Sequence, residues 1–150
     1  MDTRSYVIEE ASKLFYENGI KAVRMDDIAV HCSMSKRTIY ELFESREKLL
    51  EECTDSMMSR LSTLFDNIAS KAQNVLGEFW LVFGASFDKP KVGRLLRELS
   101  KLYPALAKKM SEKHYYQTLD QNHKKLQKGV QEGLILSQLV LDYFAVTFTN

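Results

Sequence analysis

The stretch MDDIAVHCSMSKRTIYELFESREKLL, residues 25–50, decides the fold. It contains two short helical patterns, 26–32 and 36–43, which are separated by a tight turn at Ser33 and Met34. Two short helices joined by so tight a turn predict a helix-turn-helix, in which the second helix enters the major groove of DNA.

The second of these helices is expected to have two distinct faces. At about 100° per residue, Ile39, Leu42 and Phe43 fall on one side, which should pack in a core. The opposite side carries the polar residues of the helix, namely Arg37, Tyr40, Glu41 and Glu44.

The residue types on and beside this polar face suit DNA. Arg37 can donate two parallel hydrogen bonds to guanine O6 and N7, or to a phosphate. Lys36 and the Tyr40 hydroxyl suit phosphates, and Arg46 is placed to hold the backbone beside the groove. Glu41 has two interpretations, because it could accept a hydrogen bond from cytosine N4 or repel incorrect approaches.

Outside this stretch the sequence pattern predicts only helices. The first should begin near Asp2 and Thr3 and end at Gly19, and a long helix should follow Ser45. Later helical patterns cover residues 75–87, 91–102, 105–128 and 139–148, with a turn bracketed by Gly129 and Gly133. We therefore predict an all-α protein, with a helix-turn-helix domain at residues 1–46 and a helical effector-binding and dimerisation domain at residues 47–150.

The composition indicates a globular protein but gives no support for DNA binding by itself. Among the 150 residues 45% are hydrophobic and 27% charged, which argues against a disordered chain. The net charge is only +1, so any basic face must be made by folding. Cys32 and Cys53 lie in helical patterns and are expected to be reduced, and neither a signal peptide nor a membrane span is recognisable. We expect a cytoplasmic location.

The ordered series of motifs resembles the TetR (TetR/AcrR) family of regulators. The resemblance covers residues 8–50, and its most specific part is the run from Ser35 to Phe43 followed by Ser45-Arg46-Glu47. It implies a homodimer that binds an operator and is released by a small ligand held in the C-terminal helices. It also implies a set of residues at the DNA, namely Ser35, Lys36, Arg37, Thr38, Tyr40 and Arg46.

Three positions depart from the family pattern. Ser33 stands where glycine is usual in the turn, although serine adopts a positive φ less readily. Arg24 stands where many members have a capping threonine, so a cap is lost and a phosphate contact is gained. The sequence ends at Asn150, inside what resembles the first of two dimerisation helices. Either the sequence is incomplete or the dimer is built differently.

Aromatic side chains in the C-terminal part predict a site for an apolar or aromatic effector. The candidate residues are Phe79, Trp80, Phe83, Phe87, Tyr103, Tyr115 and Tyr116. The alternative is that these residues are plain core, which is the more frequent role of aromatic residues at helical spacing. An apolar helix that begins near Leu139 is expected to pair with its symmetry mate through Leu139, Val140, Tyr143, Phe144 and Phe148.

We predict a DNA-binding transcriptional regulator, a ligand-responsive repressor that binds a palindromic operator as a dimer. No cofactor is expected, and the three histidines lack the spacing of a metal site. An enzyme is disfavoured because no nucleophile–base pair, phosphate loop or paired carboxylates can be recognised. A second alternative is a helical interaction module that does not bind DNA. It stays open because the net charge is low and because Ser33 departs from the family pattern in the turn.

Overall fold

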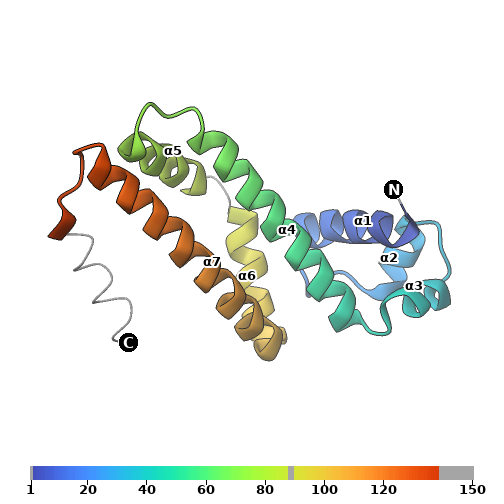
Figure 1. Cartoon of the computed structure of the whole chain (residues 1–150). Coiled ribbons are helices and arrows are strands. Elements are labelled where there is room, and N and C mark those ends of the chain that lie inside the picture. The colour runs from blue at the N-terminus through green and yellow to red at the C-terminus, as the bar shows by residue number, and fades with distance from the viewer. Residues whose placement is uncertain (1, 88–89, 139–150) are drawn as a thin grey trace. The chain divides into compact units, whose positions relative to one another are not determined.

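The structure is a computed structural model that describes residues 2–87 and 90–138. The described residues form seven helices and no strand, so the all-α prediction is confirmed (Figure 1). These helices are α1 (Thr3–Asn18), α2 (Met25–His31), α3 (Lys36–Phe43), α4 (Arg46–Ala69), α5 (Val75–Phe87), α6 (Pro90–Leu102) and α7 (Pro104–Gln131). No described helix is long and apolar enough to cross a membrane. The predicted dimerisation helix, 139–148, lies outside the described residues.

The chain divides into two compact units. The first comprises Met1–Thr63 and Lys89–Ser111, and the second comprises Leu64–Asp88 and Glu112–Asn150. The unit boundaries therefore fall within α4 and α7. The division at residue 46, between a DNA-binding domain and an effector-binding and dimerisation domain, concerns function and stays a prediction.

The first helix begins and ends where the sequence indicates. The carboxylate of Asp2 accepts a hydrogen bond from the Ser5 amide at 2.7 Å, which satisfies one unpaired donor of the first turn. Gly19 follows α1 with φ 89°, and a Cβ there would lie 2.8 Å from a carboxylate oxygen of Glu98. Both its backbone conformation and its close neighbour therefore favour glycine.

The turn between α2 and α3 is built on a residue with unusual backbone geometry. Ser33 has φ 55°, in the left-handed region, and the Met34 amide donates to the Ala29 carbonyl at 2.9 Å. The chain thus reverses between α2 and α3 without a glycine. Ser35 then caps α3, because its hydroxyl accepts a hydrogen bond from the Thr38 amide at 3.0 Å.

A single hydrophobic core holds α1, α2 and α3 together and extends into later helices. Phe15, Ile28, Ile39 and Phe43 are at most 1% exposed. The same cluster of buried residues includes four from α6 and the start of α7, namely Leu95, Leu99, Leu106 and Met110. The helix-turn-helix core is therefore completed by residues far along the chain.

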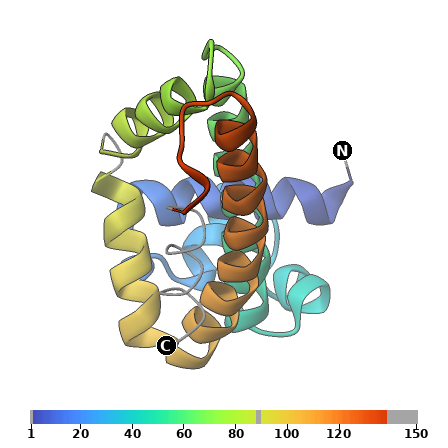
Figure 2. The ribbon, with the colours of Figure 1, turned by 60° about the vertical axis from the view of Figure 1, so that its left-hand side comes forward.

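Helix α6 lies against α1 (Figure 2), and polar contacts fasten it to the end of that helix. The Arg94 guanidinium donates to the Tyr16 carbonyl at 3.0 Å and to the Glu17 carbonyl at 2.8 Å. The Glu98 carboxylate accepts from the Lys21 amide at 3.0 Å. These contacts satisfy backbone groups at the end of α1 and in the following loop.

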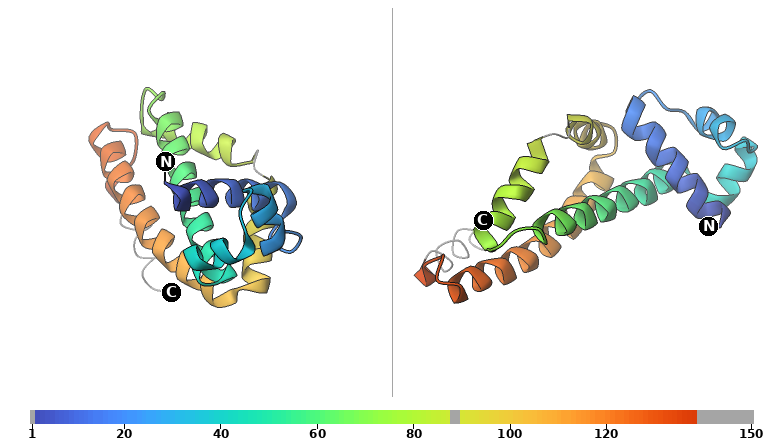
Figure 3. Two further views of the ribbon diagram at one scale, coloured as in Figure 1. Left: turned by 90° about the vertical axis from the view of Figure 1, so that its right-hand side faces the viewer. Right: turned by 90° about the horizontal axis from the view of Figure 1, so that it is seen from above.

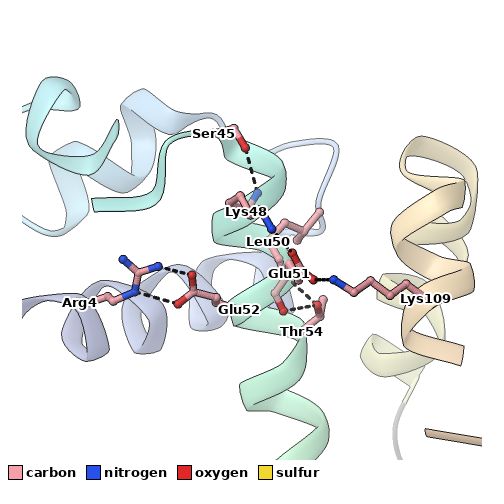
Figure 4. Close-up of polar contacts among 8 residues, drawn as sticks. All are labelled: Arg4, Ser45, Lys48, Leu50, Glu51, Glu52, Thr54 and Lys109. Carbon is pink, nitrogen blue, oxygen red and sulfur yellow. Dashed lines mark hydrogen bonds and ion pairs between the residues drawn. The ribbon is translucent and has the colours of Figure 1, made fainter. Parts of the chain in front are cut away.

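The fourth helix runs without a break for 24 residues (Figure 3). Its first part in the first unit carries ion pairs on two sides: Arg4 binds Glu52, and both Lys48 and Lys109 bind Glu51 (Figure 4). The hydrogen bonds from Lys109 and then Lys48 lower the pKa of Glu51.

The second unit differs from the sequence expectation at two places. The segment 75–87 is apolar and aromatic on several sides, a pattern that predicts a central helix buried by its neighbours, yet Leu76 is 49% exposed and Trp80 is 76% exposed. The turn expected between Gly129 and Gly133 begins later than predicted, since α7 continues to Gln131 and the positive φ of 71° falls at Gly133. A Cβ at Gly129 would lie 2.6 Å from Ile135 and 2.9 Å from Val75, so this glycine makes room for close packing instead of ending the helix.

The geometry of Ser33 generates a prediction about stability. Replacing Ser33 by glycine should relieve the left-handed strain, and we expect the free energy of unfolding to rise by about 0.5–1 kcal/mol. Ser33→Val should have the opposite effect, since a branched Cβ is disfavoured at positive φ. Urea unfolding of the three proteins measures both changes. A Ser33→Gly variant that is less stable than the wild type would contradict the interpretation that the backbone at Ser33 is strained.

Candidate nucleic-acid interface

The exposed face of α3 is the one that the helical wheel predicts. Ile39 and Phe43 are buried in the core, whereas the side chains of Arg37 and Glu41 are 88% and 60% exposed. Tyr40 is 39% exposed and lies on the same face. The core contacts therefore fix the rotation of α3 so that its polar residues face solvent.

Two carboxylates hold the cations of this face. The Lys36 ammonium lies 2.9 Å from a carboxylate oxygen of Asp26 on α2, and this hydrogen-bonded pair raises the pKa of Lys36. Arg37 Nε donates to Glu41 Oε1 at 2.7 Å, one turn further along α3. Phosphates would have to compete with both carboxylates for these cations.

A shallow groove beside α3 contains four of the seven predicted DNA contacts. It is lined by Lys21, Arg24, Lys36, Tyr40 and Arg46, together with Met25, Asp26, Val23, Leu102 and Tyr103. Arg24 precedes α2 and makes no side-chain cap, but its amide donates to the Asp27 carboxylate at 2.7 Å. Its guanidinium is therefore not used in capping, in agreement with the predicted loss of a cap.

Arg46 has a different environment from the other predicted DNA contacts. Its guanidinium donates to the Ile20 carbonyl at 2.6 Å, to the Val23 carbonyl at 3.0 Å and to the Tyr103 hydroxyl. It also lies 5.6 Å from the centroid of the Tyr103 ring and 6.0 Å from that of Phe15. This half-buried guanidinium connects the α1–α2 loop to the joint between α6 and α7.

These contacts also give Tyr103 a role that the sequence does not indicate. Tyr103 is predicted to line the effector site, but its hydroxyl accepts the hydrogen bond from Arg46. Of the other predicted effector residues, Trp80 is largely exposed. The side chains of Phe79, Phe83, Phe87, Tyr115 and Tyr116 lie outside the described ones, as do residues 139–150.

Sequence analysis overlooks two residues of this surface. Lys21 lines the groove, and Asp26 forms the ion pair with Lys36. The sequence gives no clear signal for the Asp26–Lys36 pair, because the two residues lie on different helices. In the described part of the chain no group of three or more histidine, cysteine, aspartate or glutamate residues could hold a metal ion.

A buried helix-turn-helix core with an exposed arginine, lysine and tyrosine on its second helix defines a DNA-binding protein. Residues 7–53 match the family model described as bacterial regulatory proteins, tetR family. Residues 7–53 are therefore a DNA-binding domain of the TetR type, and the chain is similar to DNA-binding transcriptional regulators of the TetR family.

Similarity to known regulators extends along most of the chain. The HTH-type transcriptional regulator YhgD of Bacillus subtilis is 21% identical, and the match covers 90% of this chain and 73% of YhgD. The HTH-type transcriptional repressor KstR2 of Mycolicibacterium smegmatis is 24% identical, with 93% of this chain and 70% of KstR2 covered. A solved TetR-family regulator from Mesorhizobium loti has the same fold, with a TM-score of 0.72 and 21% identity over 94% of this chain and 77% of that one.

The contacts of Arg46 predict that this residue stabilises the fold. Arg46→Ala should lower the free energy of unfolding by about 2–3 kcal/mol, since it removes charged hydrogen bonds and leaves two carbonyls without this donor. Tyr103→Phe should cost less, about 1 kcal/mol, because it removes a single acceptor. Arg37→Ala is the matched control and should unfold like the wild type. Unchanged stability of Arg46→Ala would instead favour the role at the DNA that the sequence predicts.

Proposed function

We propose that the protein is a ligand-responsive repressor that binds a palindromic operator as a homodimer, with the exposed face of α3 in the major groove. The observation that carries this proposal is the orientation of α3. Its apolar side is buried at Ile39 and Phe43, and its free side presents Arg37 and Tyr40. Arg37 contacts base edges, while Lys36 and Tyr40 contact phosphates.

The capped start of α3 supports this arrangement. Ser35 accepts the hydrogen bond of the Thr38 amide, and the positive end of the helix dipole at Lys36 and Arg37 favours a phosphate there. Arg24 and Lys21 extend the same surface across the groove beside α3. The repressor activity is proposed by analogy with KstR2, whose name describes it as a repressor.

A dimer is proposed because a single helix reads few base pairs. Two copies would place two α3 helices in successive major grooves, about one helical turn of DNA apart. The operator should then be a palindrome with half-sites at that spacing. Selection of bound sequences from a random duplex pool identifies it, and a footprint that protects one half-site only would contradict the dimer.

Replacing Arg37 tests the proposed DNA contact. Arg37→Ala should lower affinity for the selected duplex by about 1–3 kcal/mol, or roughly 5- to 150-fold, without changing thermal stability. Arg60→Ala is the matched control, because Arg60 is an exposed arginine of α4 outside the proposed DNA contacts. Fluorescence anisotropy with a labelled duplex measures both. Equal affinities of the two variants for the selected duplex would remove Arg37 from the interface.

The proposed effector is an apolar or aromatic compound that binds near Trp80. Support comes from the exposure of Trp80 and Leu76, which lie four residues apart on α5 and so share one side of the helix. Exposed apolar side chains that lie together mark binding sites more often than isolated ones do. Release of DNA requires that the compound prefer a state of the dimer with low operator affinity.

Trp80 offers a direct optical test of the effector site, because the chain contains no other tryptophan. We expect the apolar dye 1-anilinonaphthalene-8-sulfonate to quench Trp80 fluorescence on titration and to raise the Kd for the selected duplex several-fold. Trp80→Ala should weaken dye binding. Quenching with an unchanged duplex Kd would show a site that is not coupled to DNA binding.

A further inference from the structure

The exposed ion pair of the recognition helix has a geometry that bears on sequence discrimination. Arg37 Nε and Glu41 Oε1 lie 2.7 Å apart, and both side chains are mostly exposed. The spacing of four residues places them on the same side of α3. Neither side chain is buried in the core, so the pair lies on the face of α3 that is proposed to meet DNA.

The hydrogen bond uses one specific edge of the guanidinium. Arginine has five N–H groups, and the single one on Nε is engaged by Glu41. The two Nη groups keep parallel donors, which match guanine O6 and N7 in the major groove. Glu41 therefore restrains Arg37 in one orientation while leaving free the donors that read a base.

A phosphate group meets this pair differently from a base edge. The Glu41 carboxylate repels a phosphate that approaches Arg37, whereas guanine presents neutral acceptors. In a complex with a duplex of arbitrary sequence, Arg37 has no guanine to bind and turns to a phosphate. No base contact then offsets the repulsion between the Glu41 carboxylate and that phosphate. The carboxylate should therefore weaken binding to arbitrary duplex more than binding to the operator.

The second carboxylate of this surface provides an internal contrast. Asp26 binds Lys36, whose ammonium suits phosphate and reads no base. Neutralising Asp26 should therefore strengthen binding to operator and to arbitrary duplex alike. The two acids are alike in exposure, 64% for Asp26 and 60% for Glu41, but are expected to differ in what they control.

We propose that Glu41 is a specificity-determining residue of the DNA interface, which acts by positioning Arg37 and by repelling phosphate from it. This inference rests on the proposed function, since it needs α3 in the major groove. It gives Glu41 an indirect role, in contrast to a direct hydrogen bond from cytosine N4 to its carboxylate.

The test compares the Kd of full-length variants for the selected duplex with the Kd for a random-sequence duplex, over a series of salt concentrations. Glu41→Gln should raise the affinity for the random duplex about three- to fivefold, which is the scale of one exposed ion pair. The slope of log affinity against log salt concentration should become steeper by up to about one released counterion. Glu41→Ala should in addition weaken binding to the selected duplex. Both variants should therefore lower the specificity ratio.

Matched controls separate this effect from a general change of charge. Asp26→Asn should raise both affinities and leave the ratio unchanged. Asp120→Asn removes the carboxylate of an exposed pair with Lys124 that has the same four-residue spacing, and should change neither affinity. Thermal unfolding of each variant checks that the fold is kept.

A double-mutant cycle decides whether Glu41 acts through Arg37. In the Arg37→Ala background, Glu41→Ala should no longer change the specificity ratio. A ratio that still falls in that background means that Glu41 reads a base by itself, and this overturns the proposal. An unchanged ratio in both single Glu41 variants also overturns it. If the wild type binds neither duplex at low salt, the proposed function fails instead.

Discussion

Burial of Ile39 and Phe43 is the constraint on which the rest of the DNA surface depends. Truncating a buried phenylalanine typically costs about 3–5 kcal/mol, whereas an exposed ion pair contributes about 0–1 kcal/mol. The core therefore decides which side of α3 faces outward, and the pairs of Lys36 and Arg37 only adjust the side chains on that face. The side of α3 on which Arg37 lies is thus set by the buried residues beneath the helix.

The same core does not belong to the helix-turn-helix alone. Leu95 and Leu99 of α6 and Leu106 of α7 are buried in one cluster with Ile39 and Phe43. Arg46 and Glu98 add polar contacts to the α1–α2 loop from α4 and α6. The helices that meet DNA are therefore supported by elements that the sequence assigns to the effector domain. A change in α6 has a direct physical route to the start of α2.

Features that depend on neighbouring residues could be predicted from the sequence. The caps at Asp2 and Ser35, the positive φ at Ser33 and the two faces of α3 all follow from local backbone rules. The partners of Arg46 could not be predicted, because the Ile20 carbonyl and the Tyr103 hydroxyl are distant from it along the chain. In addition, a lysine or arginine near a helix-turn-helix is usually interpreted as a DNA contact.

Two further differences have the same origin in tertiary contacts. Gly129 has the local signature of a helix end, yet α7 continues past it to Gln131, and Val75 and Ile135 lie where a Cβ of this residue would be. Trp80 belongs to an apolar segment, yet most of its surface is exposed. A periodic pattern identifies a helix but does not specify how much of that helix its neighbours cover.

The central claim, that the solvent-facing side of α3 is the surface that meets DNA, is tested most directly by nuclear magnetic resonance of the labelled protein. Amide shifts are recorded during titration with a duplex selected from a random pool. The account predicts that the largest changes occur at residues 36–41 and at the start of α2, with small changes at the buried Phe15. Changes that leave α3 unaffected, or that centre on α7, would contradict it.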